Sequence, residues 1–163
     1  MADPLVIIRI ENLDRTAAAL KDMSIDLDRE LETVLDEAAA YLLDVTRKRF
    51  LAETDPDGNP WEPSFSGLRR RSKGDTGTLF DTGSLFHSID LLETRPRQRV
   101  IGVNPATINT RTGEKVEEYA IKHQEGIGPG IVQRKFIGVS FDDESVIDRL
   151  LQARIGPILN RKF

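Results

Sequence analysis

The sequence predicts an α+β protein in which a long N-terminal helix and a C-terminal helix pack on a small, mainly antiparallel sheet, with long polar loops. Three observations predict this class. Apolar residues recur at helical spacing over 26–50, short β-rich runs occur at 5–10 and 88–103, and a capping sequence opens the last apolar stretch near residue 140. The length of 163 residues suits one domain with its own core, so we expect a single unit over 1–163.

The chain is expected to begin with a strand and a short helix. Residues 5–10 are rich in Val and Ile, which are typical of strands. Asn12 is a suitable cap for a helix over 13–23, because its side chain can accept a hydrogen bond from a free backbone N–H of the first turn.

The long helix is predicted from Asp26 to about Phe50. One face is apolar throughout, at positions three or four residues apart: Leu27, Leu31, Val34, Leu35, Ala38, Leu42 and Val45. The cationic run 47–49 is favourable at the negative end of the helix dipole, and Asp55-Pro56 does not easily continue a helix.

Two loops are predicted between this helix and the sheet. The sequence DPDGNPWEP at 55–63 is rich in turn-forming residues and predicts a stiff bend. Trp61 in this stretch is either a core residue or an interface anchor. The segment 64–78 is polar, basic and contains glycine without a period, which predicts a flexible loop.

The rest of the chain is predicted as a hairpin, a loop, a strand and a helix. A helical turn runs from Gly83 through Leu85, and strands at 88–94 and 99–103 follow. We expect a flexible loop or protruding hairpin at 104–118. A last strand passes through Phe136 and Ile137. Ser140 with Asp143 then opens the final helix, whose inward residues are Val146, Ile147, Leu150 and Leu151.

Composition limits the classes of function. The chain has no cysteine, which excludes disulfides and thiolate metal sites and favours a reducing compartment such as a bacterial cytoplasm. Its net charge of -4 gives no general attraction to nucleic acid. The longest apolar run, Leu5–Ile8, is far shorter than the roughly 20 residues of a membrane-spanning helix, so we expect no membrane partner.

Asp81-Thr82-Gly83 matches the triplet around the catalytic carboxylate of aspartic proteases. These enzymes need two such carboxylates that share a proton. The second copy, Asp75-Thr76-Gly77, lies too close upstream to serve as the partner, so a homodimer would be required. Because a short match is common by chance, we favour a turn in which Asp81 or Thr82 caps the helical turn before Leu85, with a homodimeric aspartic protease as the alternative.

Other candidate sites are weak, and we expect no catalytic, cofactor-binding or metal-binding residues. Asp55, Asp57 and Asn59 alternate as in an EF-hand, but Pro60 and Ser66 stand where such a loop needs Gly and Glu. Neither histidine, 87 or 123, has further ligands at a recognisable metal spacing.

A basic cluster lies within the predicted 64–78 loop, at Arg69, Arg70, Arg71 and Lys73. Such a cluster can bind phosphates, so a nucleic-acid-binding module is a further alternative. Stacking platforms are lacking, and we favour a partner-binding assembly loop.

Six motifs follow one another in order: RKRF at 47–50, DPDGNPW at 55–61, LFDTGSLFHSI at 79–89, VIGV at 100–103, YAIKHQEG at 119–126 and RKFIGVS at 134–140. Together they resemble the phage virion morphogenesis family, the tail completion proteins of Mu-like and related tailed phages and prophages. The matching signature positions are Arg49, Phe50, Pro56, Asp57, Gly58, Pro60, Trp61, Gly83, Leu85, Ser88, Ile89, Tyr119, Ala120, His123, Gln124, Gly126, Arg134, Phe136 and Gly138. The chain departs from the family at Lys135, where Pro is usual, and in a longer 104–118 loop.

The resemblance implies a non-enzymatic structural protein of the head–tail neck that acts in tail completion and head–tail joining. It implies a ring of identical subunits, for which we expect a hexamer, in contact with neighbouring neck and tail proteins, with DNA only as cargo passing through. The expected location is the neck or upper tail of the virion, after assembly in the cytoplasm of the bacterial host. The family also implies a strand at the Tyr-Ala-x-x-His-Gln-x-Gly motif.

Overall fold

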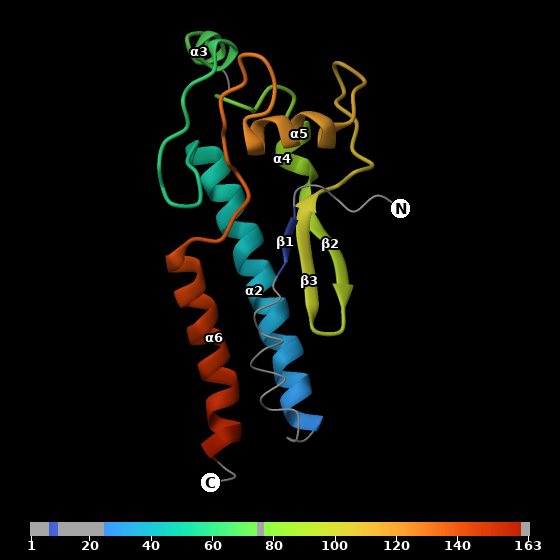
Figure 1. Ribbon diagram of the computed structural model, residues 1–163, viewed down its shortest axis with the longest axis vertical. Coiled ribbons are helices and arrows are strands. Elements are labelled where there is room, and N and C mark those ends of the chain that lie inside the picture. Colours follow the sequence, from blue (N-terminus) through green and yellow to red (C-terminus); the bar gives the residue numbers. More distant parts are fainter. Residues whose placement is uncertain (1–6, 10–24, 75–76, 161–163) are drawn as a thin grey trace.

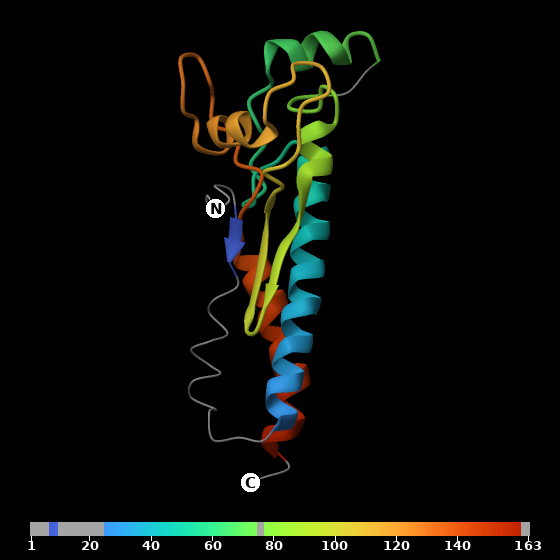
Figure 2. The same cartoon turned by 90° about the vertical axis from the view of Figure 1, so that its right-hand side faces the viewer.

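The computed structural model describes residues 7–9, 25–74 and 77–160 of the chain (Figure 1). Its elements are β1 (Ile7–Arg9), α2 (Ile25–Ala52), α3 (Phe65–Arg71), α4 (Ser84–Ser88), β2 (Ile89–Arg95), β3 (Gln98–Val103), α5 (Val116–Glu125) and α6 (Phe141–Asn160). The predicted α+β class is confirmed, because two long helices pack with a small antiparallel sheet (Figures 1 and 2). The predicted helix over 13–23 and residues 5, 6 and 10 of the first strand lie outside the described residues.

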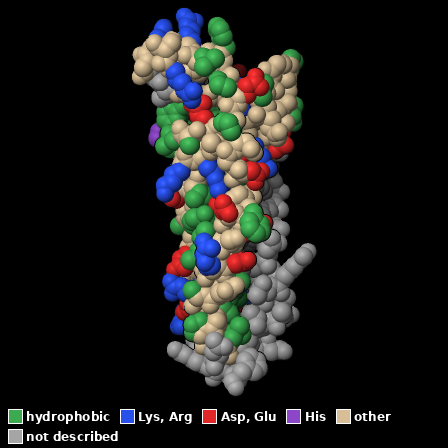
Figure 3. All heavy atoms as spheres, turned by 90° about the vertical axis from the view of Figure 1, so that its left-hand side faces the viewer, with side chains coloured by type: hydrophobic (Ala, Val, Ile, Leu, Met, Phe, Trp, Pro, Cys, Tyr) green, Lys and Arg blue, Asp and Glu red, His purple; other side chains and the backbone are tan. Residues whose placement is uncertain are grey.

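Helices α2 and α6 form the shaft of the molecule and run side by side in opposite directions (Figures 1 and 2). The predicted apolar face of α2 is its buried face, and Val34, Leu35 and Leu42 are at most 1% exposed. Near the lower end of the shaft, Leu27 and Leu31 pack with Ile155 of α6. The face that carries α6 mixes acidic, basic and hydrophobic side chains along the shaft (Figure 3).

The sheet has the strand order β1-β3-β2, with antiparallel pairing on both sides of β3. The predicted hairpin is confirmed. Arg99 of β3 attaches the hairpin to α2, since its buried guanidinium donates to Asp36 Oδ1 at 2.6 Å and to Glu32 Oε2 at 2.9 Å. A buried cation with two carboxylate partners is stabilised where an unpaired one would not be tolerated.

The segment 64–78, predicted as a loop, contains helix α3. Ser64 caps this helix, because its Oγ accepts a hydrogen bond from the Gly67 N–H at 3.0 Å. Thr78, at the end of this segment, connects it to residues on either side of the 55–63 bend. Its N–H donates to Glu53 Oε1 at 2.9 Å, and its Oγ1 accepts from the Ser64 N–H at 3.3 Å. The helix is too short to show an apolar period in the sequence, and its contacts with other segments include Arg71 with Glu53, which follows α2, and Arg70 with Asp81.

The strand expected at YAIKHQEG is wrong, because this motif lies in α5. Buried Val116, Ala120 and Gln124 are four residues apart and share one helix face. Gly126 ends the helix in the left-handed conformation with φ of 69°. The hairpin expected within 104–118 is present as far as the bridge between Ile108 and Lys115, after which α5 begins.

The strand predicted at Phe136 and Ile137 is also wrong, because no ladder forms there. The side-chain amide of Gln124 takes the place of a strand partner. Its Oε1 accepts from the N–H groups of Phe136 and Ile137 at 3.0 and 3.2 Å, and its Nε2 donates to the Ile137 carbonyl at 2.8 Å. The final helix begins as predicted: Ser140 N–H donates to Asp143 Oδ2 at 2.8 Å, and Asp143 N–H donates to Ser140 Oγ at 3.2 Å.

Candidate functional site

The predicted signature positions lie together at the upper end of the molecule, where α2 ends beneath α3, α4 and α5 (Figure 1). Those that are buried are Phe50, Pro56, Trp61, Gly83, Leu85, Ser88, Ile89, Ala120, Gln124, Arg134 and Phe136. Those that are half-buried are Arg49, Tyr119, His123, Gly126 and Gly138, and those that are exposed are Asp57, Gly58 and Pro60. Most of the signature therefore builds the interior of this end.

Phe50 is the centre of an aromatic cluster. Its ring lies 5.3 Å from that of Trp61, 5.6 Å from Phe86 and 5.8 Å from Phe136, measured between ring centroids. Edge-to-face geometry of this kind adds to the burial of aromatic area. The indole N–H of Trp61 donates to the Lys135 carbonyl at 3.0 Å. With 5% of its surface exposed, Trp61 is a core residue and not an exposed interface anchor.

Arg134 ties the segment before α6 to its neighbours. Its side-chain Nε donates to the carbonyl of Glu62 at 2.8 Å, and its backbone N–H donates to the carbonyl of His123 at 2.7 Å. Gly138 lies against the ring of Pro56, where an added Cβ would stand 2.7 Å from Pro56 Cγ. The 55–63 bend, α5 and the segment before α6 are thus held together by signature residues.

The Asp55 carboxylate forms hydrogen bonds within its own bend. Its carboxylate accepts hydrogen bonds from Asn59, one from the backbone N–H at 2.8 Å and one from the side-chain amide at 2.9 Å. Burial raises the pKa of Asp55, but these hydrogen bonds outweigh burial and lower it. Among the described residues, no group of three His, Asp or Glu side chains is placed to hold a metal ion.

Asp81-Thr82-Gly83 forms a bend before α4, as favoured from the sequence, but the predicted cap by Asp81 or Thr82 is wrong, because Gly83 is the N-cap residue and no side-chain hydrogen bond caps α4. Thr82 Oγ1 accepts from the Ser84 N–H at 3.3 Å, and Gly83 has φ of 76°, a conformation that favours glycine. The Asp81 carboxylate accepts from Arg111 at 2.7 Å and from Arg70 at 3.3 Å. Within the described part of one chain, this carboxylate faces two guanidinium groups, and the second carboxylate of an aspartic protease dyad would have to come from another copy.

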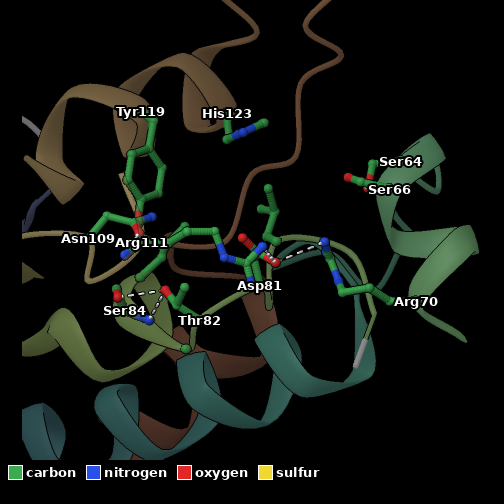
Figure 4. A pocket seen from close by; sticks show the side chains of 13 residues that line it. Ser64, Ser66, Arg70, Asp81, Thr82, Ser84, Asn109, Arg111, Tyr119 and His123 are labelled. Carbon is green, nitrogen blue, oxygen red and sulfur yellow. Dashed lines mark hydrogen bonds and ion pairs between the residues drawn. The ribbon is translucent and has the colours of Figure 1, made fainter. Parts of the chain in front are cut away.

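Asp81 lies in a pocket of about 310 Å³ between α3, α4, α5 and the 104–115 loop (Figure 4). Arg70 enters from α3 and Arg111 from the loop, and both point toward Asp81. The wall formed by α5 carries Tyr119 and His123. Ser64, Ser66, Thr82, Ser84 and Asn109 complete the polar lining. Four separate parts of the chain form this pocket.

His123 contributes a neutral ring to this pocket. Burial, together with the positive charges of Arg134 and Lys122, lowers its pKa to about 4. Its Nδ1 is buried and has no hydrogen-bond partner among the described residues, and the same is true of Arg70 Nε. The pocket therefore contains two guanidinium groups, one carboxylate and two buried polar atoms without partners.

The predicted assembly cluster is divided in the structure. Arg70 faces the pocket, and Arg71 forms an ion pair with Glu53. Arg69 and Lys73 are exposed and form no ion pair with a described residue. The sequence did not identify Arg111 or Asn109, because nothing local to 104–118 indicates that this loop reaches Asp81.

Comparison with known proteins gives one clear result. The family model described as phage virion morphogenesis family matches residues 8–156. No curated protein sequence and no solved structure matches the chain significantly. None of the described helices is long and apolar enough to cross a membrane. The signature residues that build the upper end all fall within the matched range, and the chain belongs to the phage virion morphogenesis family.

Proposed function

We propose that the chain is a structural tail-completion protein that forms a ring at the head–tail neck and joins tails to heads. The family match over residues 8–156 carries this proposal, because it places the chain in virion morphogenesis. The order of the six sequence motifs, which resembles that of tail completion proteins, supports the finer assignment.

The shape of the subunit supports a ring. Its shaft of two long helices ends in an upper end made of short helices and loops (Figures 1 and 2). Rod-like subunits of this kind can stand side by side, with their upper ends facing the next layer of the neck. Identical contacts between such subunits close into a cyclic assembly when the rotation between them divides a circle.

We favour six copies in the ring. Its partners are neighbouring neck and tail proteins, and DNA passes through it as cargo. The protein is part of the finished virion, at the neck or upper tail, and assembles in the cytoplasm of the host.

Deletion of the gene from its phage or prophage tests the function. We expect full heads and unjoined tails to accumulate, and the wild-type gene supplied in trans to restore joined particles. Labelled protein should be found by electron microscopy at the junction of head and tail. Joined, infectious particles without the protein, or label confined to the capsid or the tail tip, would contradict the proposal.

A further inference from the structure

The pocket that contains Asp81 has charged side chains suited to binding an acidic group of a partner. Arg70 and Arg111 supply two positive charges against the single carboxylate of Asp81, and His123 is neutral at physiological pH. These three side chains together carry one net positive charge, and Arg111, which binds Asp81 at 2.7 Å, has a side chain that is 64% exposed. An arriving carboxylate would be bound by charge-assisted hydrogen bonds, which are stronger than those between neutral groups.

Helix α3, which lines this pocket with Ser66 and Arg70, also carries two exposed large apolar side chains, of which Phe65 is next to lining residues. Phe65 is 85% exposed and stands in the sequence between the lining residues Ser64 and Ser66. Leu68, one turn further along α3, is 51% exposed. Exposed aromatic and aliphatic side chains next to a polar pocket are typical of a surface that binds another protein.

A complementary corner lies at the start of α6, lower on the shaft (Figure 1). Phe141 is 80% exposed, and Asp142 and Glu144 are exposed and form no ion pair with a described residue. Their neighbour Asp143 is buried, so it is not available to a partner. The start of α6 therefore presents one exposed aromatic ring, that of Phe141, and two exposed carboxylates, those of Asp142 and Glu144.

The other obvious acidic surface, along α2, is already neutralised within the chain. Its ion pairs join Asp28 to Arg97, Glu32 and Asp36 to Arg99, Glu37 to Arg154, and Asp44 to Lys48. A partner that binds through α2 would have to replace these contacts. At the start of α6, a partner can bind Asp142 and Glu144 without breaking an ion pair with a described residue.

We propose that the pocket of one copy receives the Phe141–Asp142 corner of a second copy. In this contact the Asp142 carboxylate binds Arg111, and the Phe141 ring packs on Phe65. The two surfaces lie on different parts of the same chain, so the contact repeats from copy to copy and can close into a ring. The inference rests on the proposed ring function and assigns the surfaces that would form the ring.

Disulfide trapping tests the contact directly, because the chain has no cysteine of its own. Ser66→Cys lines the pocket, and Ser145→Cys lies beside Phe141, whose carbonyl accepts a hydrogen bond from the Ser145 hydroxyl at 3.0 Å. The double variant should give a ladder of covalent oligomers after mild oxidation. The matched control combines Ser66→Cys with Thr94→Cys, at an exposed position of β2, and should give no ladder. Equal ladders from both pairs, or none from the first, would overturn the proposal.

A charge exchange provides the second test. Arg111→Glu and Asp142→Arg should each weaken assembly by about tenfold or more in sedimentation velocity, and the double variant should recover most of the loss. Both positions are exposed, so circular dichroism should show an unchanged fold, although Arg111→Glu also removes the ion pair with Asp81. Additive losses in the double variant would contradict the contact.

The failure of this inference can be told apart from the failure of the proposed function. If the wild-type protein assembles and neither test affects its assembly, the ring forms through a different contact, and the proposed ring function still stands. A wild-type protein that stays monomeric at all concentrations overturns the contact, while labelling of the virion still decides where the protein acts.

Discussion

Arg49 Nη2 lies 2.8 Å from Asp143 Oδ2, so a cation near the end of α2 binds a carboxylate at the start of α6. The carboxylate is almost completely buried and also accepts hydrogen bonds from Ser140 and from the Tyr41 hydroxyl. The pair joins the ends of the two shaft helices at the level where the aromatic cluster begins.

Removal of the Asp143 carboxylate should be strongly destabilising. Asp143→Ala leaves Arg49 without its carboxylate partner and removes the acceptor of the Ser140 N–H at the start of α6, and we expect a loss of about 3 to 5 kcal/mol in the free energy of unfolding. Asp142→Ala, at the exposed neighbouring position, is the matched control and should change stability by about 0.5 kcal/mol or less. Urea denaturation of the two variants measures the difference. Equal stabilities would show that the pair contributes nothing.

Acid should weaken this pair. Burial raises the pKa of Asp143, but hydrogen bonds from Ser140, Arg49 and Tyr41 outweigh burial and lower it below the usual 3.8. Its stabilisation is therefore complete well above pH 3.8 and is lost as the pH falls through the folded-state pKa. Denaturation curves below pH 4 should show this loss in the wild type and not in Asp143→Ala.

His123 should add a pH dependence of its own at higher pH. Its pKa is 6.5 when unfolded and about 4 when folded, so the unfolded state binds the extra proton between these values. Stability should therefore fall as the pH is lowered from about 6.5 to about 4 and then level off. His123→Gln should flatten this part of the profile, whereas His87→Gln, at an exposed position, serves as the control. A profile that His123→Gln leaves unchanged would contradict this assignment.

Gln124 should be essential to the segment before α6. Gln124→Ala removes three hydrogen bonds and leaves the buried N–H groups of Phe136 and Ile137 without an acceptor, so we expect a loss of about 2 to 4 kcal/mol. Hydrogen exchange should show early loss of protection at these two amides. Gln133→Ala, which removes only a bond to the Gln124 carbonyl from an exposed side chain, should cost about 1 kcal/mol or less.

Asp81→Asn separates the structural role of this residue from a catalytic one. The turn and both arginine contacts can be kept by the amide oxygen, so stability should change by about 1 kcal/mol or less. In a phage that lacks the gene, the variant should restore joined particles. A folded variant that fails to do so would return attention to an aspartic protease.

The sequence by itself determined the two long helices, the hairpin and the family. These signals are local or ordered along the chain: Leu27, Leu31 and Val34 follow a helical period, and Ser140 with Asp143 marks a helix start. It also determined that Asp81-Thr82-Gly83 is a turn, because each of these residues favours one.

Only the tertiary structure decided how the upper end is built. Gln124 replaces a strand partner for Phe136, and Arg111 reaches Asp81 across the pocket, although both pairs are distant in the sequence. The spacing of apolar residues predicts a strand or a helix. It does not predict which distant side chain forms a hydrogen bond with a given backbone N–H or carboxylate. These partners are chosen when α2, α5 and the loops pack together, because buried polar groups must find hydrogen bonds there.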